Sequence, residues 1–160
     1  MAVVDTYTNA IAEAGKAVFN ASIVNGGEPI SMVAAYTPAA TDSDASIYRF
    51  YKDVPSNLIP VGLTFMTSSD VTTGTVDIGV YLPNGGAAAD ADCLADGLST
   101  ATASRTLDGL ASVAIADTQK TLAELAGLDS SKYPVVDIAV LANDALGAQA
   151  LALKGQFLKK

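Results

Sequence analysis

Residues 46–82 read SIYRFYKDVPSNLIPVGLTFMTSSDVTTGTVDIGVYL, in which three apolar segments are separated by turn sequences. The first segment, residues 46–52, is rich in aromatic side chains. In the other two segments every second residue is apolar, namely Ile59, Val61, Leu63 and Phe65, then Val76, Ile78, Val80 and Leu82. This alternation is typical of antiparallel strands that bury one face. With Val54-Pro55-Ser56-Asn57 and Thr72-Thr73-Gly74 as turns, the segment predicts a β-sandwich.

Strand patterns also flank this segment. Residues 30–36 predict a first strand, followed by a turn region over residues 37–45, and residues 149–158 predict a last strand with Leu151, Leu153 and Phe157 on one face. The sequence VDIGV at 76–80 returns as VDIAV at 136–140, which predicts neighbouring or symmetrically placed strands that turn an aspartate outwards. Residues 46–52 carry aromatic side chains on both faces, so we expect another sheet or subunit to cover one of them.

Two regions lack a strand pattern. Residues 83–133 predict an excursion with two short helices, one over Asp90–Leu94 and one over Gln119–Ala126, the second capped by Asp117 or Thr118 and ended by Gly127. Residues 1–27 predict an N-terminal arm, in which Gly15 interrupts a weak helical pattern and Asn25-Gly26-Gly27 breaks regular structure. We therefore expect a single sandwich domain over residues 28–160 that follows this arm.

The composition excludes several common classes of function. Nine Lys and Arg against seventeen Asp and Glu give a formal net charge of −8, and scattered basic residues do not form the positive face that nucleic acid requires. The chain has no histidine, and Cys93 is its single cysteine, so the usual acid-base and nucleophilic pairs are missing. No segment predicts a secretory signal or a membrane span. We expect a protein made in a cytoplasm, with no membrane or nucleic-acid partner and no enzymatic activity.

Three aspartates are the only candidate metal ligands that the sequence suggests. Asp90, Asp92 and Asp96 follow Gly85-Gly86 and superficially resemble an acidic calcium loop. A loop of that type needs a bidentate glutamate at its twelfth position, which counted from Asp90 is Ala101. Helix capping and solvation explain these carboxylates without a metal, so we predict neither a metal site nor a cofactor.

Five short motifs follow one another between residues 45 and 158. They are Ile47-Tyr48-Arg49-Phe50-Tyr51, Val54-Pro55-Ser56-Asn57, Gly74-Thr75-Val76-Asp77-Ile78-Gly79-Val80-Tyr81, the segment 85–92, and Leu122-Ala123-Glu124-Leu125-Ala126-Gly127-Leu128. Their order and spacing resemble the head decoration, or capsid cement, proteins of tailed bacteriophages. The resemblance implies an antiparallel jelly-roll-like β-sandwich with one or two short helices. It also implies a homodimer or homotrimer on the outer surface of the virion head, bound across neighbouring copies of the major capsid protein.

A decoration role requires binding rather than chemistry, which agrees with the composition. Many modest, symmetric contacts to an expanded shell add together and stabilise it. Within the arm, we expect Val3, Val4 and Tyr7 to anchor the protein on a capsid neighbour. The acidic charge would keep free copies soluble and away from DNA.

Two other classes of function stay open at the level of the sequence. A carbohydrate- or host-binding module on a phage tail is compatible with a β-sandwich, although such sites usually display Trp or Tyr platforms and this chain has no tryptophan. A carboxylate-dependent hydrolase is the third class, and the sequence offers it no convincing acidic pair.

Overall fold

The computed structural model describes residues 5–7, 29–68, 74–101 and 105–160, and it is mainly β, as predicted. Its strands are β1 Asp5–Tyr7, β2 Ile30–Tyr36, β3 Ile47–Pro55, β4 Leu58–Thr67, β5 Thr75–Tyr81, β6 Ala88–Ser99, β7 Arg105–Asp108, β8 Val135–Ala142 and β9 Leu151–Lys159. A 3-10 helix at Ile115–Asp117 and the four-residue helix α2 at Leu122–Leu125 complete the described elements.

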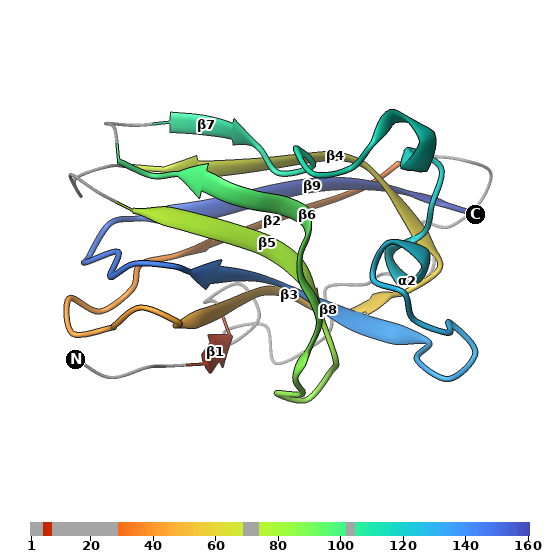
Figure 1. Ribbon diagram of the computed structural model, residues 1–160, viewed down its shortest axis with the longest axis horizontal. Helices are drawn as coiled ribbons and strands as arrows, with labels where there is room; N and C mark the ends of the chain where they lie inside the picture. Colours follow the sequence, from red (N-terminus) through yellow and green to blue (C-terminus); the bar gives the residue numbers. More distant parts are fainter. Residues whose placement is uncertain (1–4, 8–28, 69–73, 102–104) are drawn as a thin grey trace.

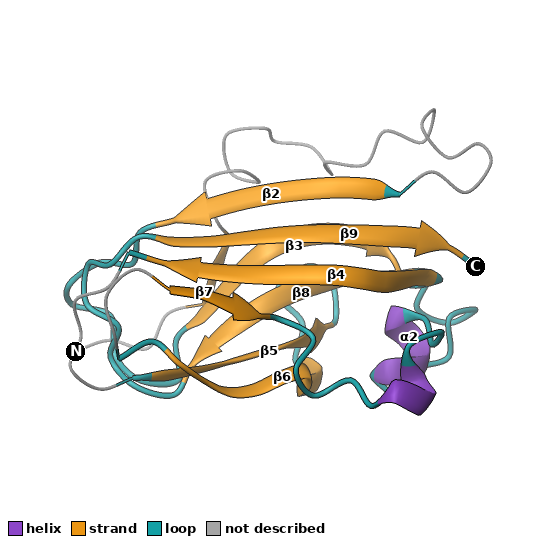
Figure 2. Cartoon of the chain, turned by 90° about the horizontal axis from the view of Figure 1, so that it is seen from above, coloured by secondary structure: helices purple, strands orange, loops and turns teal. Residues whose placement is uncertain are grey.

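The strands form two sheets that pack face to face. One sheet has the order β1-β3-β8-β5-β6, and the other has the order β2-β9-β4-β7 (Figure 1). All pairings are antiparallel except that of β1 with β3, which is parallel. Viewed from above, β2, β9, β4 and β7 lie in front of the other sheet, and α2 lies near one end of the sandwich (Figure 2). The predicted β-sandwich is therefore confirmed.

Several strands lie where the alternating pattern placed them. Strand β2 has the predicted bounds, and β9 buries Leu151, Leu153 and Phe157 as expected. The two related sequences form β5 and β8, which are antiparallel neighbours with Gly79 directly opposite Ala139. The prediction that they pair side by side is confirmed, and their apolar residues face the core together.

A bulge in β4 makes the predicted orientations of Ile59 and Val61 wrong. Val61 was expected on the buried face with Leu63 and Phe65, but it is 46% exposed. The pairing of β4 with β9 shifts between Pro60 and Gly62, and this extra residue reverses the parity of the strand. Leu63 and Phe65 are buried as predicted, whereas Val61 turns to the surface.

The segment 83–133 differs most from expectation. The helix predicted over Asp90–Leu94 is wrong, because these residues belong to β6, where pairing with β5 outweighs the weak strand preference of Ala and Asp. Together with β7, β6 makes this segment part of both sheets. The second helix exists but is shorter, and it is capped by Thr121 rather than Asp117 or Thr118. Thr121 and Glu124 form a reciprocal capping box, and Gly127 follows with a φ of +65°.

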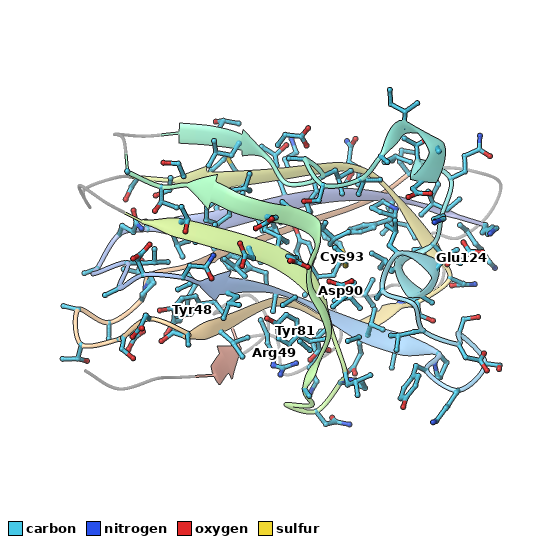
Figure 3. The ribbon with its side chains drawn as sticks, in the orientation of Figure 1. Tyr48, Arg49, Tyr81, Asp90, Cys93 and Glu124 are labelled. Atoms are coloured by element: carbon cyan, nitrogen blue, oxygen red, sulfur yellow. The ribbon has the colours of Figure 1, made fainter. Side chains whose placement is uncertain are left out.

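Arg49 is fully buried on the face of β3 that points away from the facing sheet (Figure 3). Its guanidinium lies 3.1 Å from the carboxylate of Asp137 on β8. It also donates hydrogen bonds to the carbonyl oxygens of Leu82, at 3.1 Å, and Gly86, at 2.7 Å. The ring of Tyr81 lies beneath it, 5.2 Å away. These contacts join β3, β8, β5 and the turn that leads into β6.

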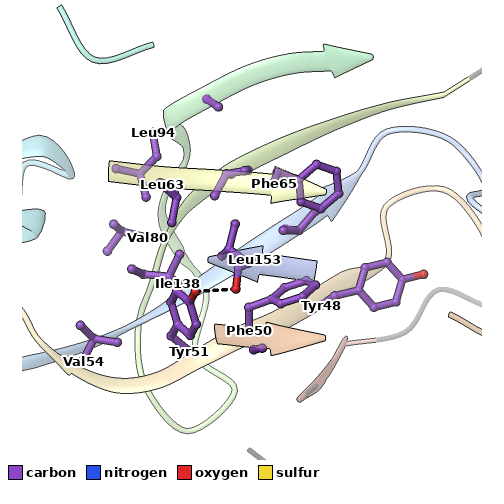
Figure 4. Close-up of a cluster of buried hydrophobic side chains, with 14 of the residues drawn as sticks. Tyr48, Phe50, Tyr51, Val54, Leu63, Phe65, Val80, Leu94, Ile138 and Leu153 are labelled. Carbon is purple, nitrogen blue, oxygen red and sulfur yellow. Dashed lines mark hydrogen bonds between the residues drawn. The ribbon is translucent and has the colours of Figure 1, made fainter. Parts of the chain in front are cut away.

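The opposite face of β3 supplies much of the core. A register shift between Arg49 and Tyr51 allows Phe50 and Tyr51 both to join the buried cluster (Figure 4). The Tyr51 hydroxyl crosses the sandwich and lies 2.7 Å from the Leu153 carbonyl oxygen of β9 and 3.0 Å from the Met32 carbonyl oxygen of β2. The aromatic residues of 46–52 are therefore covered by the facing sheet, and Arg49 lies on the other face.

Replacement of Gly79 by alanine should destabilise the sandwich. A Cβ at this position would overlap the backbone of Asp90 and Ala91, where β6 folds across β5. We expect the Gly79→Ala variant to lose about 1–3 kcal/mol of unfolding free energy, measured by urea denaturation. Gly62→Ala is the matched control, because its Cβ would have its nearest neighbour at 3.5 Å, an ordinary contact. Equal stability of the two variants would contradict this packing.

Replacing one partner of the buried Arg49–Asp137 ion pair should lower the unfolding free energy, because the other partner then stays buried alone. Burial raises the pKa of Asp137, whereas the Asp53 N–H and the Arg49 guanidinium oppose this rise. We expect Arg49→Met or Asp137→Asn alone to lower the unfolding free energy by about 3–5 kcal/mol, because each leaves a buried polar group without its partner. In a double-mutant cycle, the variant carrying both changes should lose less than the sum of the two. Strict additivity would contradict the pairing.

Candidate functional site

The three aspartates singled out in the sequence lie around one surface hollow. Its volume is about 360 Å³, and its lining residues are Asp90, Asp92, Cys93, Asp96, Ser112, Val113, Asp117, Lys120 and Leu125. The hollow forms because β6 has four residues between Asp90 and Ala95, the partners of Val80 and Ile78, whereas a single residue separates Val80 from Ile78 on β5. This bulged stretch faces the loop before α2. The sequence thus identified carboxylates that the fold does bring together.

The electrostatics of this hollow are those of an acidic surface. A hydrogen bond with the Asp90 side chain is the main cause that raises the pKa of Asp92, with further repulsion from Asp96. Asp117 is neutralised locally by Lys120, at 2.8 Å. Within the described residues, no three His, Cys, Asp or Glu side chains converge as a metal site would require. The arrangement offers solvated carboxylates at the surface rather than a formed ligand set.

Cys93 lies beside these carboxylates but holds its thiol in protonated form. Its sulfur lies 3.6 Å from the Asp90 carbonyl oxygen, and the side chain packs partly against the core (Figure 3). Burial raises the pKa of the thiol to about 12, with a smaller effect from the Asp90 charge. Because nucleophilic attack by cysteine requires the thiolate, this environment does not activate Cys93.

The residues predicted to contact a capsid are only partly described. Tyr7 belongs to β1, which pairs in parallel with β3, with its Cα opposite that of Arg49. Val3 and Val4 lie outside the described residues. The contact predicted for these three residues therefore remains a prediction.

An exposed apolar patch was not anticipated from the sequence. We define it as Pro60, Val61, Leu110, Val113 and Ile115, of which Val61 and Ile115 are exposed, Leu110 and Val113 are half-buried and Pro60 is buried at its base. The first four line, with Thr118, a hollow of about 280 Å³. Ile115 follows on the same loop and is 92% exposed, in the 3-10 helix. Ile115 is a single isoleucine between two alanines, so it gives no periodic signal in the sequence. The bulge that exposes Val61 also leaves no sign in the alternation of apolar and polar residues.

The outer face of the four-stranded sheet is open and has few charges. Figure 2 looks onto this face, which no described element covers. Val33, Lys154 and Thr64 lie side by side across it, from β2, β9 and β4. Its other residues, from the same parity of each strand, are Ser31, Ala35, Ile59, Gly62, Met66, Thr106, Asp108, Ala152, Gln156 and Leu158. A surface whose side chains are mostly uncharged is suited to packing against another protein.

The C-terminus is attached to α2 by an ion pair. The Lys160 ammonium lies 2.6 Å and 2.9 Å from the two carboxylate oxygens of Glu124. The same carboxylate accepts the Thr121 N–H of the capping box at 2.7 Å. The hydrogen bond from Lys160 is the main cause that lowers the pKa of Glu124 to about 2, and the Thr121 N–H adds to it.

Among the described residues, no helix has the length and apolarity that crossing a bilayer requires.

The fold, but not the sequence, is shared with known proteins. No protein-family model matches the chain, and no curated protein matches its sequence. A chain in the capsid of Ralstonia phage GP4 has a TM-score of 0.65 at 11% identity, over 98% of this chain and 99% of the other. A chain of the cyanophage Pam1 capsid asymmetric unit has a TM-score of 0.56 at 14% identity, over 85% and 88% of the two chains. At such identities the likeness establishes a common fold.

The Glu124 ion pair gives a prediction that titration can test. In the wild type, we expect the Glu124 carboxyl to titrate near pH 2, whereas in Lys160→Ala its midpoint should move up towards the ordinary value of 4.5. Because the folded pKa lies below the unfolded one, the stabilisation from this pair is present above about pH 4.5 and is lost as the pH falls towards 2. Carboxyl chemical shifts measured by NMR against pH report the midpoint. Lys159→Ala is the control, and an unchanged midpoint in Lys160→Ala would contradict the contact.

Proposed function

We propose that the protein is a structural component of a bacteriophage head, and that it decorates the outside of the expanded shell and stabilises the lattice of the major capsid protein. The observation that carries this proposal is the fold that the chain shares, over nearly its whole length, with a chain in the GP4 capsid. The Pam1 capsid chain supports it independently. The motifs between residues 45 and 158, which resemble those of head decoration proteins, are the reason for the finer role.

The surface of the molecule supports a binding role. Six of the described aromatic side chains, Tyr48, Phe50, Tyr51, Phe65, Tyr81 and Phe157, are buried, whereas Tyr36 and Tyr133 are half-buried. The alternative, a carbohydrate- or host-binding module, would need an exposed aromatic platform. Within the part of the chain that the structure describes, the exposed large hydrophobic residues are Val33, Val61 and Ile115, which are all aliphatic. Aliphatic contacts suit a protein partner better than a sugar ring.

The stabilising effect is mechanical and follows from mass action. Packaged DNA presses outwards on the shell, and a protein that binds only the expanded lattice shifts the equilibrium towards that lattice. Each contact can be modest, because copies bind at many equivalent positions. We assign the apolar patch around Ile115 to the capsid contact, since an aliphatic side chain that is 92% exposed gains most from burial against a partner.

Co-sedimentation with heads tests the decoration role. The purified protein should bind expanded, undecorated heads in saturable fashion, at a ratio fixed by lattice symmetry, and should not bind precursor shells. Binding to neither form would contradict decoration and favour the host-binding alternative, for which a glycan array is the direct test.

A substitution tests the assignment of the patch. Ile115→Asp removes apolar contact and adds a charge, so its dissociation constant for expanded heads should rise about tenfold or more. Ala111→Asp adds the same charge at an exposed position of the same loop and should bind as the wild type does. Equal binding by both variants would exclude the Ile115 patch from the contact without excluding decoration.

A further inference from the structure

The four strands at or beside the sheet edges differ in how well they resist pairing with another strand. Strand β6 has three register shifts against β5, and it carries Asp90, Asp92 and Asp96. Strand β7 has only four residues. Strand β3 is covered by β1 over its first three residues and ends in Pro55. Bulges, charges, brevity, proline and cover are the usual devices that prevent edge-to-edge association.

Strand β2 has none of these devices. It runs for seven residues, Ile-Ser-Met-Val-Ala-Ala-Tyr, without a charge, a proline or a glycine. All seven residues pair with β9 in unbroken register, so the strand is regular. Among the described residues, no strand pairs with its other edge. Val33, at its centre, is 62% exposed on the outer face of the sheet.

We propose that β2 is the edge along which two copies of this chain pair, antiparallel about a two-fold axis through Val33, to join their four-stranded sheets into one eight-stranded sheet. Pairing would satisfy the backbone groups of both edges at once. Antiparallel alignment about Val33 places Val33 opposite its copy and Ser31 opposite Ala35. Each cross-strand pair is small or apolar, so the two surfaces are self-complementary.

Charge does not oppose this arrangement, although each copy carries a net charge of −8. Strand β2 itself is uncharged. Acidic residues of the chain lie elsewhere, notably on β6. The nearest charged partner in the sheet is Lys154, opposite Val33 on β9. Across the two-fold axis, the two copies of Lys154 would be three strand spacings apart, roughly 14 Å. This distance exceeds the Debye length of about 10 Å at 0.1 M salt, so their repulsion is largely screened.

Sedimentation velocity on the full chain, without heads, tests the pairing. The wild type should form a species of twice the chain mass of 16.2 kDa. Val33→Lys places two like charges opposite each other, and it should raise the dimer dissociation constant about tenfold or more. Val61→Lys is the matched control, because it is also an exposed valine of the same sheet, and it should dimerise as the wild type does.

Mixing two variants tests the register. Val33→Lys and Val33→Asp should each be monomeric alone, and an equimolar mixture should form heterodimers, detected by native mass spectrometry, because opposite charges then face each other. A monomeric or trimeric wild type, an undiminished Val33→Lys dimer or a mixture without heterodimers would overturn the proposal. These measurements involve no capsid, so their outcome is independent of whether the protein decorates heads.

Discussion

The buried guanidinium of Arg49 is the constraint on which the five-stranded sheet depends. A charge removed from water requires partners, and Arg49 has them on separate elements: Asp137 of β8, the Leu82 and Gly86 carbonyl oxygens, and the Tyr81 ring. Meeting these requirements positions the turn that leads into β6. Strand β6 then crosses directly over Gly79, and its bulge forms the acidic hollow. The acidic hollow thus follows directly after the turn that Arg49 holds by its hydrogen bonds.

The same strand also holds the two sheets together. Its bulge turns Tyr51 towards the facing sheet, where the hydroxyl reaches backbone carbonyls on β2 and β9. Gly155 leaves room for this ring, since a Cβ there would lie 3.1 Å from it. Burial raises the pKa of Tyr51, so the hydroxyl remains a donor at neutral pH. Because most of the described aromatic side chains are buried, the exterior carries mainly small, charged and a few aliphatic side chains. Such a rigid body with a mild surface is suited to repeated, symmetric contacts.

The alternation of apolar and polar residues in the sequence correctly predicted the strands that bury one face along their whole length. Strands β2, β5, β8 and β9 are of this kind, and the pairing of β5 with β8 was visible in their shared sequence. Alternation failed at Val61, because a bulge reverses parity without a sequence signal. It failed over β6, because alanine and aspartate have little preference for strands and the pairing with β5 decides. For the candidate site, the sequence indicated Asp90, Asp92 and Asp96 but not the apolar patch around Ile115, which depends on how a loop meets β4.

The central claim is that this sandwich belongs on the outer surface of an expanded head. The most direct measurement is a cryo-electron microscopy reconstruction of expanded heads incubated with the protein, compared with the same heads alone. The account predicts additional density in the shape of a two-sheet sandwich, at symmetry-equivalent positions outside the shell and in contact with neighbouring capsid subunits. Identical reconstructions, or additional density only inside the shell or at the tail, would contradict it.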